Sequence, residues 1–449
     1  MPTLLLRNAD VLVTMDPDRR EIEGGGLFAR DGAIEAVGPS ADLPATADET
    51  IDARGLVVIP GLVNTHHHIF QNLTRAVPGA QDESLFGWLR RLYPVWRHIG
   101  PEDVFHSAQL GLAELALSGC TTSSDHLYLY PNGARIDDEI AAAREIGVRF
   151  HACRGALTVG ESAGGLPPDD LCETEAFVLA DTIRTIDAFH DPRPGAMVRV
   201  AVAPCSPFTV SPDHMREAAL LARDKGVMLH THLAENDEDI AYSLERFGQR
   251  PGDFAEALGW TGDDVWHAHC VKLDDAEIAL FARTLTGVAH CPNSNMRLAS
   301  GIAPVRAMRD AGVKVGLGVD GSASSDAADL MNEVRQTMLL QRVARGPSAM
   351  GAREALEIAT LGGARVLGRD DVGSLAPGKR ADFACYPTGG IEMAGAWDRV
   401  AALVLTGPHR ARHTYVEGRA VVRDGVLATA DADGLIAAHG ARVRRLMAL

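Results

Sequence analysis

The sequence predicts an α/β protein: a parallel (β/α)₈ barrel of the TIM type, with a small β-sandwich formed by the two ends of the chain. Eight short apolar runs alternate with helical stretches through the middle of the chain. Both ends contain short strand-like runs joined by tight turns, and 449 residues exceed what one core usually spans. We therefore expect residues 1–58 and 370–449 to form the sandwich and residues 59–369 to form the barrel.

Short strands and tight turns characterise both ends of the sequence. At the start, "TLLLRNADVLVTM" and "LFARDGAIEAVG" are strand-like, and Asp31-Gly32 lies between two apolar runs as a hairpin turn would. The last 70 or so residues have the same character, in "ADFACYP", "VAALVLTG" and "HTYVEGRAVVRDGVLA". Two all-β ends that flank one long middle segment indicate that the ends meet.

The middle of the chain supplies the predicted barrel strands. They are "LVVIPGLVNTH", "CTTSSDH", "VRFHACR", "VRVAVAPC", "VMLHTHL", "VWHAHC", "VAHCP" and "VKVGLGVD". Most are apolar on both faces, as expected for strands that are covered on both sides. One helix between them is clearly delimited, with Ser211 as N-cap, Pro212 in the first turn and Gly226 at its end. An open doubly wound sheet is the alternative, but no Gly-x-Gly-x-x-Gly follows the first strand.

Composition excludes several classes of protein. A net charge of −17 without a run of Lys or Arg argues against nucleic-acid binding. No apolar run is long enough to cross a membrane, and the first residues lack the features of a signal peptide. The seven cysteines are scattered, without a paired C-x-x-C, which is typical of free thiols in a reducing compartment. We therefore expect a cytoplasmic protein.

The ends of the predicted strands carry a consistent set of polar residues. In a barrel of this type, the chemistry lies at the C-terminal ends of the strands. The residues there are His66, His68, His230, His232, Glu235, His267, His269 and Asp320. A single histidine on a strand is more often a packed core residue than a ligand. Several strands that all end in His or Asp at one rim instead indicate a metal site, because imidazole and carboxylate ligands suit Zn²⁺ and Fe²⁺.

The order of these motifs resembles the amidohydrolase superfamily. "PGLVNTHHH", "HTHLAE", "HAHC" and "GLGVDG" are similar to its branch of cytosine and guanine deaminases and triazine hydrolases, and the resemblance extends to "LGGARVLGRDDVGSLAPGKRADF". It implies that one divalent metal ion, Zn²⁺ or alternatively Fe²⁺, is bound by His66, His68, His232 and Asp320. It also implies that Glu235 shuttles a proton and that His269 orients or polarises the attacking water.

The remaining histidines and the cysteines have no role in these motifs. We expect His67, His230, His267 and His290 to support the site or to pack, and Cys153, Cys205, Cys270 and Cys291 to be buried thiols. Family members that bridge two metals use a carboxylated lysine late in the barrel, and "MVRVAVAPCSPF" has no lysine at its end. The cysteine-containing pattern of other zinc deaminases is also missing. The sequence therefore predicts a single metal ion.

The chemistry expected of this set is hydrolytic deamination of a heterocycle. A divalent cation lowers the pKa of bound water to about 7, and Asp320 can accept the proton that is released. Glu235 is placed to protonate the ring nitrogen next to the carbon under attack. Asp320 or Glu235 can then return a proton to the departing ammonia.

Three residues are candidates for substrate binding. Gln71 and Trp88 lie in a long loop after the first strand, and such loops commonly cover the active site of a barrel. The carboxamide of Gln71 offers a donor and an acceptor together, which match a lactam edge. Trp88 either contacts substrate or packs the loop onto the barrel or a neighbouring subunit. Arg154 either faces an oxo group of the substrate or is a structural arginine.

Within the branch, the most detailed resemblance is to the 8-oxoguanine deaminases. It rests on "RAVPGAQDESLFGWL", "SGCTTSSDHLYLYPNG", "HACRGALTVGESAGGLPPD" and "HCPNSNMRLASGIAP". It implies a small-molecule substrate and the conversion of 8-oxoguanine and water to urate and ammonia; we also expect a homo-oligomer. The alternatives are deamination of isoxanthopterin, guanine or cytosine, and hydrolysis of a triazine or an N-acyl compound. A non-catalytic protein of this fold should have lost Glu235, His269 or Asp320, and all three are present.

Overall fold

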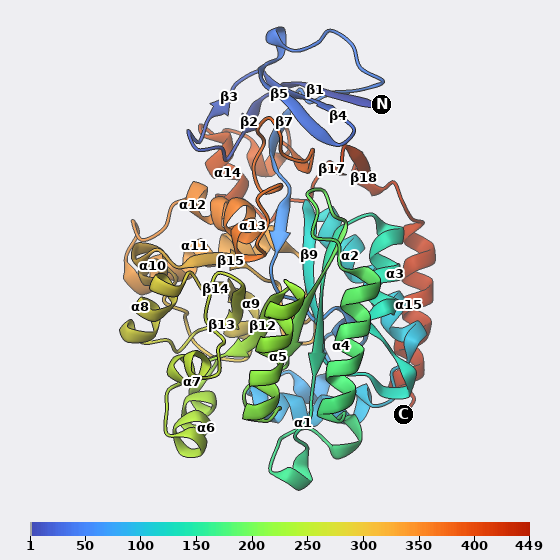
Figure 1. Ribbon diagram of the computed structural model, residues 1–449. Helices are drawn as coiled ribbons and strands as arrows, with labels where there is room; N and C mark the ends of the chain where they lie inside the picture. Colours follow the sequence, from blue (N-terminus) through green and yellow to red (C-terminus); the bar gives the residue numbers. More distant parts are fainter. Residues whose placement is uncertain (1) are drawn as a thin grey trace.

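The computed structural model describes residues 2–449, and its centre is a closed barrel of eight parallel strands (Figure 1). The strands follow the chain order around the barrel, so the last strand closes onto the first. They are β8 (Leu62–Asn64), β9 (Cys120–Leu127), β10 (Arg149–Ala156), β11 (Val198–Pro204), β12 (Met228–Leu233), β13 (Val265–His269), β14 (Gly287–His290) and β15 (Lys314–Leu317). Each lies within one of the eight predicted runs or extends at most two residues beyond it, so the predicted barrel is confirmed.

Helices connect the strands and surround the barrel (Figure 1). The helices that follow β8 to β15 are α1 (Leu85–Trp96), α2 (Pro101–Leu117), α3 (Ile136–Ile146), α4 (Glu175–Phe189), α5 (Pro212–Lys225), α6 (Asp237–Phe247), α7 (Pro251–Ala257), α8 (Asp275–Thr284), α9 (Pro292–Arg297), α10 (Val305–Ala311), α11 (Leu330–Arg345), α12 (Ala352–Glu357) and α13 (Gly363–Val366). The predicted limits of α5 are confirmed. The side chain of Ser211 accepts a hydrogen bond from the backbone of His214, and Gly226 ends the helix in a left-handed conformation.

Two further sheets form the predicted sandwich at one end of the molecule, drawn at the top of Figure 1. The first contains β5 (Ala33–Pro39), β4 (Gly25–Arg30), β1 (Thr3–Ala9) and β6 (Glu49–Asp52), in that order. The second contains β19 (Val426–Leu427), β18 (Arg419–Arg423), β17 (His413–Val416), β16 (Phe383–Pro387), β7 (Leu56–Pro60), β2 (Val11–Val13) and β3 (Glu21–Ile22). The pairing of β16 with β7 joins the two ends of the chain, as the sequence predicts.

The first predicted barrel run forms two strands instead of one. Its first half is β7, which belongs to the sandwich, and its second half is β8, which belongs to the barrel. Gly61 lies between them, where a Cβ atom would be 2.1 Å from the Oγ1 atom of Thr121. Only glycine allows this close approach of the chain to Thr121 in β9. The boundary expected between residues 58 and 59 consequently falls inside β7.

The C-terminal segment contains two helices among its strands. The run "VAALVLTG" was predicted to be a strand, and this is wrong: it forms most of α14 (Arg399–Leu405). Asp398 caps this helix by accepting a hydrogen bond from the backbone of Ala401, and tertiary packing of its apolar side chains outweighs their strand preference. The chain then ends in α15 (Ala432–Met447), which packs on α2 through an ion pair of 2.5 Å between Arg445 and Asp103.

Buried ion pairs lie where the N-terminal end of the barrel meets the segment that leads into the sandwich. Arg149, at the start of β10, is fully buried and forms an ion pair of 2.6 Å with Asp382, and it also pairs with Glu417. Arg369 and Asp371 form a second buried pair, at 2.6 Å. These pairs lie at the opposite end of the strands from the predicted active site.

The cysteines and the helices bear on two further predictions. All seven cysteines are free thiols, and Cys153, Cys205, Cys270 and Cys291 are buried, as expected. Within residues 2–449, no helix combines the length and the apolar character needed to span a membrane.

Candidate metal centre and active site

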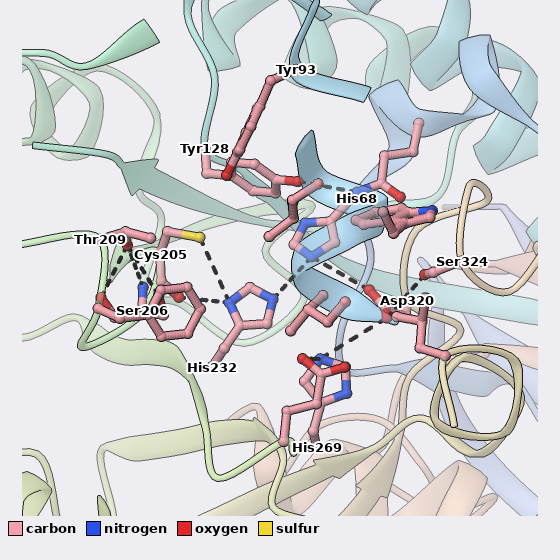
Figure 2. A pocket seen from close by; sticks show the side chains of 17 residues that line it. His68, Tyr93, Tyr128, Cys205, Ser206, Thr209, His232, His269, Asp320 and Ser324 are labelled. Carbon is pink, nitrogen blue, oxygen red and sulfur yellow. Dashed lines mark hydrogen bonds and ion pairs between the residues drawn. The ribbon is translucent and has the colours of Figure 1, made fainter. Parts of the chain in front are cut away.

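Five of the predicted residues converge at the C-terminal end of the barrel (Figure 2). His66 and His68 follow β8, His232 lies in β12, His269 ends β13 and Asp320 follows β15. The two Nε2 atoms of His68 and His232 are 3.0 Å apart. The Oδ1 atom of Asp320 lies 3.5 Å from Nε2 of His66 and 3.4 Å from Nε2 of His68. Three imidazoles and one carboxylate thus point at a common centre.

Hydrogen bonds on the far side of the rings determine which nitrogen faces this centre. The Nδ1 atom of His68 lies 2.7 Å from the carbonyl oxygen of His126, and Nδ1 of His232 lies 2.6 Å from that of Cys205. A carbonyl oxygen can only accept, so each Nδ1 must carry the hydrogen. Each Nε2 therefore presents a lone pair to the centre, as a metal ligand does.

His66 is oriented in the same way through a second histidine. Its Nδ1 atom lies 2.8 Å from Nε2 of His230, while Nδ1 of His230 lies 3.0 Å from the carbonyl oxygen of Trp266. Since His230 donates from Nδ1, its Nε2 accepts from His66, and Nε2 of His66 again carries the lone pair. That Nε2 atom is buried without a hydrogen-bond partner. His230 thus supports the site, as expected.

These features fit a divalent metal ion. Burial holds the pKa of His68 at about 3 and that of His66 well below its ordinary value, so both imidazoles are neutral, as metal ligands must be. A buried nitrogen without a partner is costly unless something else binds it. The ligand atoms of His66, His68, His126 and His232 all lie within 4.8 Å of one another. His126 was not among the predicted ligands.

Asp320 is held in place by its own loop. Its Oδ1 atom accepts a hydrogen bond from the backbone of Gly321 at 2.7 Å, and its Oδ2 atom accepts one from Ser324 at 3.2 Å. Burial alone would raise the pKa of Asp320, but the imidazoles of His66, His269 and His68 hold it well below its ordinary value. Its φ angle of 59° is unusual for a residue with a side chain and stores strain at the site.

Glu235 and His269 form a pair beside this centre. The Oε2 atom of Glu235 is 3.6 Å from Nε2 of His269, which is 4.0 Å from Oδ2 of Asp320. The Oε1 atom of Glu235 accepts a hydrogen bond of 3.2 Å from Ser300. Burial raises the pKa of Glu235 well above its ordinary value, and the nearby Asp239 and Asp320 raise it further. Glu235 can therefore carry a proton at neutral pH.

The short helix α9 supports both His269 and Asp320, and the sequence did not reveal this. Asn295 lies 3.0 Å from Nδ1 of His269 through its amide nitrogen. Ser294 forms a hydrogen bond of 3.1 Å with Ser324, which in turn bonds Asp320. The helix is fixed to α11 by Glu333, which accepts hydrogen bonds from the side chain and backbone of Asn293 at 2.6 and 3.1 Å.

A pocket opens above the convergent side chains (Figure 2). It encloses about 490 Å³ of non-protein space, including the part open to solvent. Its lining includes Leu85, Leu89, Tyr93, Phe208 and Leu298 as well as the polar residues described above. An apolar pocket with a few convergent polar groups at its base is typical of a small-molecule site.

Two of the three predicted substrate-binding residues line this pocket. Gln71 donates a hydrogen bond of 3.2 Å to the hydroxyl of Tyr128, and its Oε1 atom is buried without a partner. Its amide packs closely on Gly321, where a Cβ atom would be 1.8 Å from Oε1. Trp88 donates its indole N–H to the carbonyl oxygen of Ala323 at 3.0 Å, so it offers the pocket its ring rather than a hydrogen bond.

Arg154, the third candidate, does not line the pocket. Its side chain is fully buried and forms ion pairs with Glu173 at 2.7 Å and with Asp181 at 3.1 Å. Its guanidinium also lies over the ring of Tyr130, 4.1 Å from the ring centroid. All of these contacts are with the protein itself, so they favour the structural alternative for Arg154 over a contact with an oxo group of the substrate.

Comparisons with known proteins extend over nearly the whole chain. The amidohydrolase family model matches residues 57–421. The chain is 44% identical over 427 residues to the 8-oxoguanine deaminase of Pseudomonas aeruginosa, covering 94% of this chain and 95% of that protein. It is 39% identical over 476 residues to an isoxanthopterin deaminase from an unknown prokaryotic organism, covering 99% and 97%. The crystal structure of atrazine chlorohydrolase from Arthrobacter aurescens TC1 complexed with zinc is similar at a TM-score of 0.93 and 35% identity, covering 98% of this chain and 100% of that one.

Proposed function

Because this chain belongs to the amidohydrolase family, we propose that it catalyses the hydrolytic deamination of 8-oxoguanine, which gives urate and ammonia. The reaction type is supported above all by Glu235. Its buried carboxyl group has a raised pKa and lies between the convergent imidazoles and an apolar pocket. The substrate is inferred from 44% identity to an 8-oxoguanine deaminase over 94% of this chain.

We assign one divalent metal ion to His66, His68, His232 and Asp320. Three imidazoles and a carboxylate suit Zn²⁺, with Fe²⁺ as the alternative, and the similar atrazine chlorohydrolase structure is described as complexed with zinc. When bound, such an ion supplies Lewis acidity and lowers the pKa of water to about 7. The Nδ1 hydrogen bonds of the three histidines keep their Nε2 lone pairs directed at the ion without rearrangement.

The protein's own groups move the protons. Asp320 is ionised, so it can accept a proton from the attacking water. Burial raises the pKa of Glu235 well above its ordinary value, so it can hold a proton and donate it to the ring nitrogen next to the carbon that carries the amino group. His269 faces both carboxyl groups through Nε2 and can stabilise the negative charge that develops on the substrate. Ammonia then leaves with a proton returned by Asp320 or Glu235.

Gln71 and Trp88 are assigned to substrate binding. The buried Oε1 atom of Gln71 has no partner in the protein, so it is available to accept from a ring N–H, and Tyr128 beside it adds a hydroxyl. The ring of Trp88 provides a flat apolar surface at the pocket wall. A flat heterocycle with lactam edges matches this combination of amide, hydroxyl and aromatic groups.

The experiment that tests this function is a comparison of kcat/KM across heterocycles. The panel contains 8-oxoguanine, guanine, isoxanthopterin, cytosine and a hydroxytriazine, with release of ammonia, or of the amine from the triazine, as the readout. If polar groups of the pocket bind the C8 oxo group, guanine leaves a buried group unpaired, at roughly 1–3 kcal/mol per partner. We expect guanine to be poorer by about tenfold to a hundredfold or more, at about 1.4 kcal/mol per decade. If another ring exceeds 8-oxoguanine tenfold, the named substrate is wrong while the aminohydrolase assignment stands.

Two properties stay as predictions beside this function. Seven free thiols fit a reducing compartment, which supports the expectation of a cytoplasmic protein. We also expect a homo-oligomer, which the molar mass in solution would test.

A further inference from the structure

A second cavity lies at the N-terminal end of the barrel, away from the active site. It is lined by the first residues of consecutive strands and by the segments that precede them: His151, His190, Pro192, Arg199, Gly226, Val227, Met228, Asp263, Asp264 and Gly368. We call it the N-terminal cavity. It encloses about 940 Å³ of non-protein space, including the part open to solvent. None of these residues lines the active-site pocket.

His151 is the most buried polar side chain in this cavity. Its exposed fraction is 3%, and neither ring nitrogen has a hydrogen-bond partner within residues 2–449. Its ring packs on Trp266, with 5.4 Å between the ring centroids. A buried imidazole without partners is costly, so a polar ligand at this position would remove an unfavourable interaction.

Arg199 provides positive charge next to His151. The two residues are paired in register on β10 and β11. The guanidinium of Arg199 donates to the carbonyl oxygens of Gly368 at 3.0 Å and Pro192 at 3.4 Å, and its Nε is buried without a partner. Among residues 2–449, no carboxylate lies within 4.0 Å of it in an ion pair. An arginine with a free N–H and no counter-ion is suited to bind an oxyanion.

Most acidic residues around the cavity are paired with other cations; among residues 2–449, the exposed Asp370 near Arg199 is the exception. Asp263 binds Lys314 at 2.6 Å, Asp264 binds Arg223 at 3.0 Å and Asp371 binds Arg369 at 2.6 Å. Asp191 likewise pairs with Arg193 at 2.7 Å. Within the described residues, Arg199 is therefore the permanent cation of the cavity lining that has no ion-pair partner, while Asp263 and Asp264 in the same lining each have a cation of their own.

His190 completes the set of donors. Its Nδ1 atom accepts a hydrogen bond of 3.1 Å from the backbone of Val200, so the hydrogen of the neutral ring is on Nε2. From these contacts we propose that the N-terminal cavity binds a phosphate group through Arg199, His190 and His151. The group is either free inorganic phosphate or the phosphate of a small ester, and the cavity has room for the organic part of an ester.

The test uses the metal-loaded full-length enzyme in a buffer free of phosphate. Inorganic phosphate and ribose 5-phosphate are each titrated against potassium chloride at matched ionic strength, with Tm and calorimetric Kd as readouts. A ligand that binds the folded state raises Tm in a saturable way. Equal Kd values would identify free phosphate as sufficient, whereas ribose 5-phosphate that binds tenfold tighter would identify an ester. If neither binds saturably, the proposal is wrong.

Variants locate the site. Arg199→Gln should raise the Kd for phosphate by roughly tenfold or more, because the loss of one hydrogen bond between charged groups typically weakens binding by more than a factor of about ten. Arg199→Lys keeps the positive charge but lacks the planar guanidinium, so its Kd should lie between those of wild type and Arg199→Gln. This intermediate Kd would show that the loss in Arg199→Gln does not come from a folding defect. Arg216→Gln, in an exposed pair with Asp213 on α5, is the matched control and should bind as wild type.

A last variant separates this site from the metal centre, which could itself bind phosphate. His232→Ala should lose the active-site metal and retain phosphate binding in the N-terminal cavity. Loss of phosphate binding in His232→Ala, or an unchanged Kd in Arg199→Gln, would overturn the proposal. Neither result depends on which heterocycle the enzyme deaminates.

Discussion

Both ends of the barrel contain buried polar residues, but these residues are paired differently at the two ends. At the C-terminal end, the Nε2 atom of His66 is buried without a partner and burial raises the pKa of Glu235. At the ion pairs of the N-terminal end, Arg149 is matched by Asp382, and Arg369 by Asp371. Buried polar groups that have no partner in the protein are available for chemistry, whereas those with a partner stabilise the fold. Whether a group has a partner therefore says more about its role than its residue type does.

The cause of this difference lies in the loops. At the C-terminal end, strands run into loops that carry their polar side chains towards one axis, and His269 and Asp320 leave their strands with φ angles of 70° and 59°. At the other end, the segment that leads from α13 into β16 of the sandwich brings carboxylates to the buried arginines. Substitutions at the two ends should therefore have separable effects on turnover and on stability.

The largest effect is expected from His232→Ala at the C-terminal end. It removes one of the imidazoles that face the metal centre, so metal and deaminase activity should be lost together. The loss of turnover should exceed the roughly 10²–10⁴-fold typical of one acid–base group, because the activation of water is lost as a whole. Metal analysis and turnover are measured on the same sample. A variant that keeps its metal and more than a tenth of wild-type turnover would exclude His232 as a ligand.

Glu235→Gln should have the next largest effect, and it should leave the metal in place. The amide cannot donate and accept the proton that the carboxyl group transfers, so kcat should fall by about 10²–10⁴-fold. Glu245→Gln, exposed on the same helix α6, is the matched control and should retain wild-type kcat. Turnover of Glu235→Gln within about threefold of wild type would show that this residue only forms hydrogen bonds.

At the N-terminal end, Arg149→Met should act on stability instead of turnover. It leaves the buried carboxylate of Asp382 without its counter-ion, which costs about 3–5 kcal/mol of unfolding free energy. The kcat of the folded fraction should stay near wild type, because Arg149 is remote from the pocket. Urea unfolding is compared with that of Arg216→Met, whose exposed ion pair is worth only about 0–1 kcal/mol. Equal urea midpoints for the two variants would contradict this account of the N-terminal end.

The barrel and the convergent residues at its C-terminal end could be predicted from the sequence. Each of His66, His232 and Asp320 follows or ends an apolar run, and the strand ends of a parallel barrel meet at one rim. The error at α14 has a different origin, because its apolar run is too short to distinguish a helix from a strand. The cap at Asp398 and the packing of the helix decide the outcome.

Contacts that depend on distant segments could not be predicted in the same way. His126 is an exception: it ends the predicted run "CTTSSDH", so the strand-end argument applied to it, and it was missed because the motifs quoted for the metal site do not contain it. Arg154 meets Glu173 and Asp181, which lie 19 and 27 residues further along the chain. No periodic pattern connects such positions, so the structural alternative for Arg154 could not be selected beforehand.

Substitution of Asn295 should have the smallest of these effects, and it tests how the side chains at the C-terminal end are oriented. Its amide nitrogen lies 3.0 Å from Nδ1 of His269, so the hydrogen of a neutral His269 is directed to Nε2, which faces Glu235. Asn295→Ala should lower kcat by about 10–100-fold, the usual effect of losing such a supporting hydrogen bond, with metal content unchanged.

Asn295→Asp sharpens this prediction because it keeps the shape of the side chain. A carboxylate can only accept, so it favours the hydrogen on Nδ1 of His269 and turns a lone pair towards Glu235. Its kcat should therefore fall at least as far as that of the alanine variant, while KM stays close to wild type. Met296→Ala, on the same helix and 40% exposed, is the matched control for damage to α9. If Asn295→Asp retains wild-type kcat, the orientation of His269 does not depend on Asn295, and its burial beside Glu235 must be sufficient.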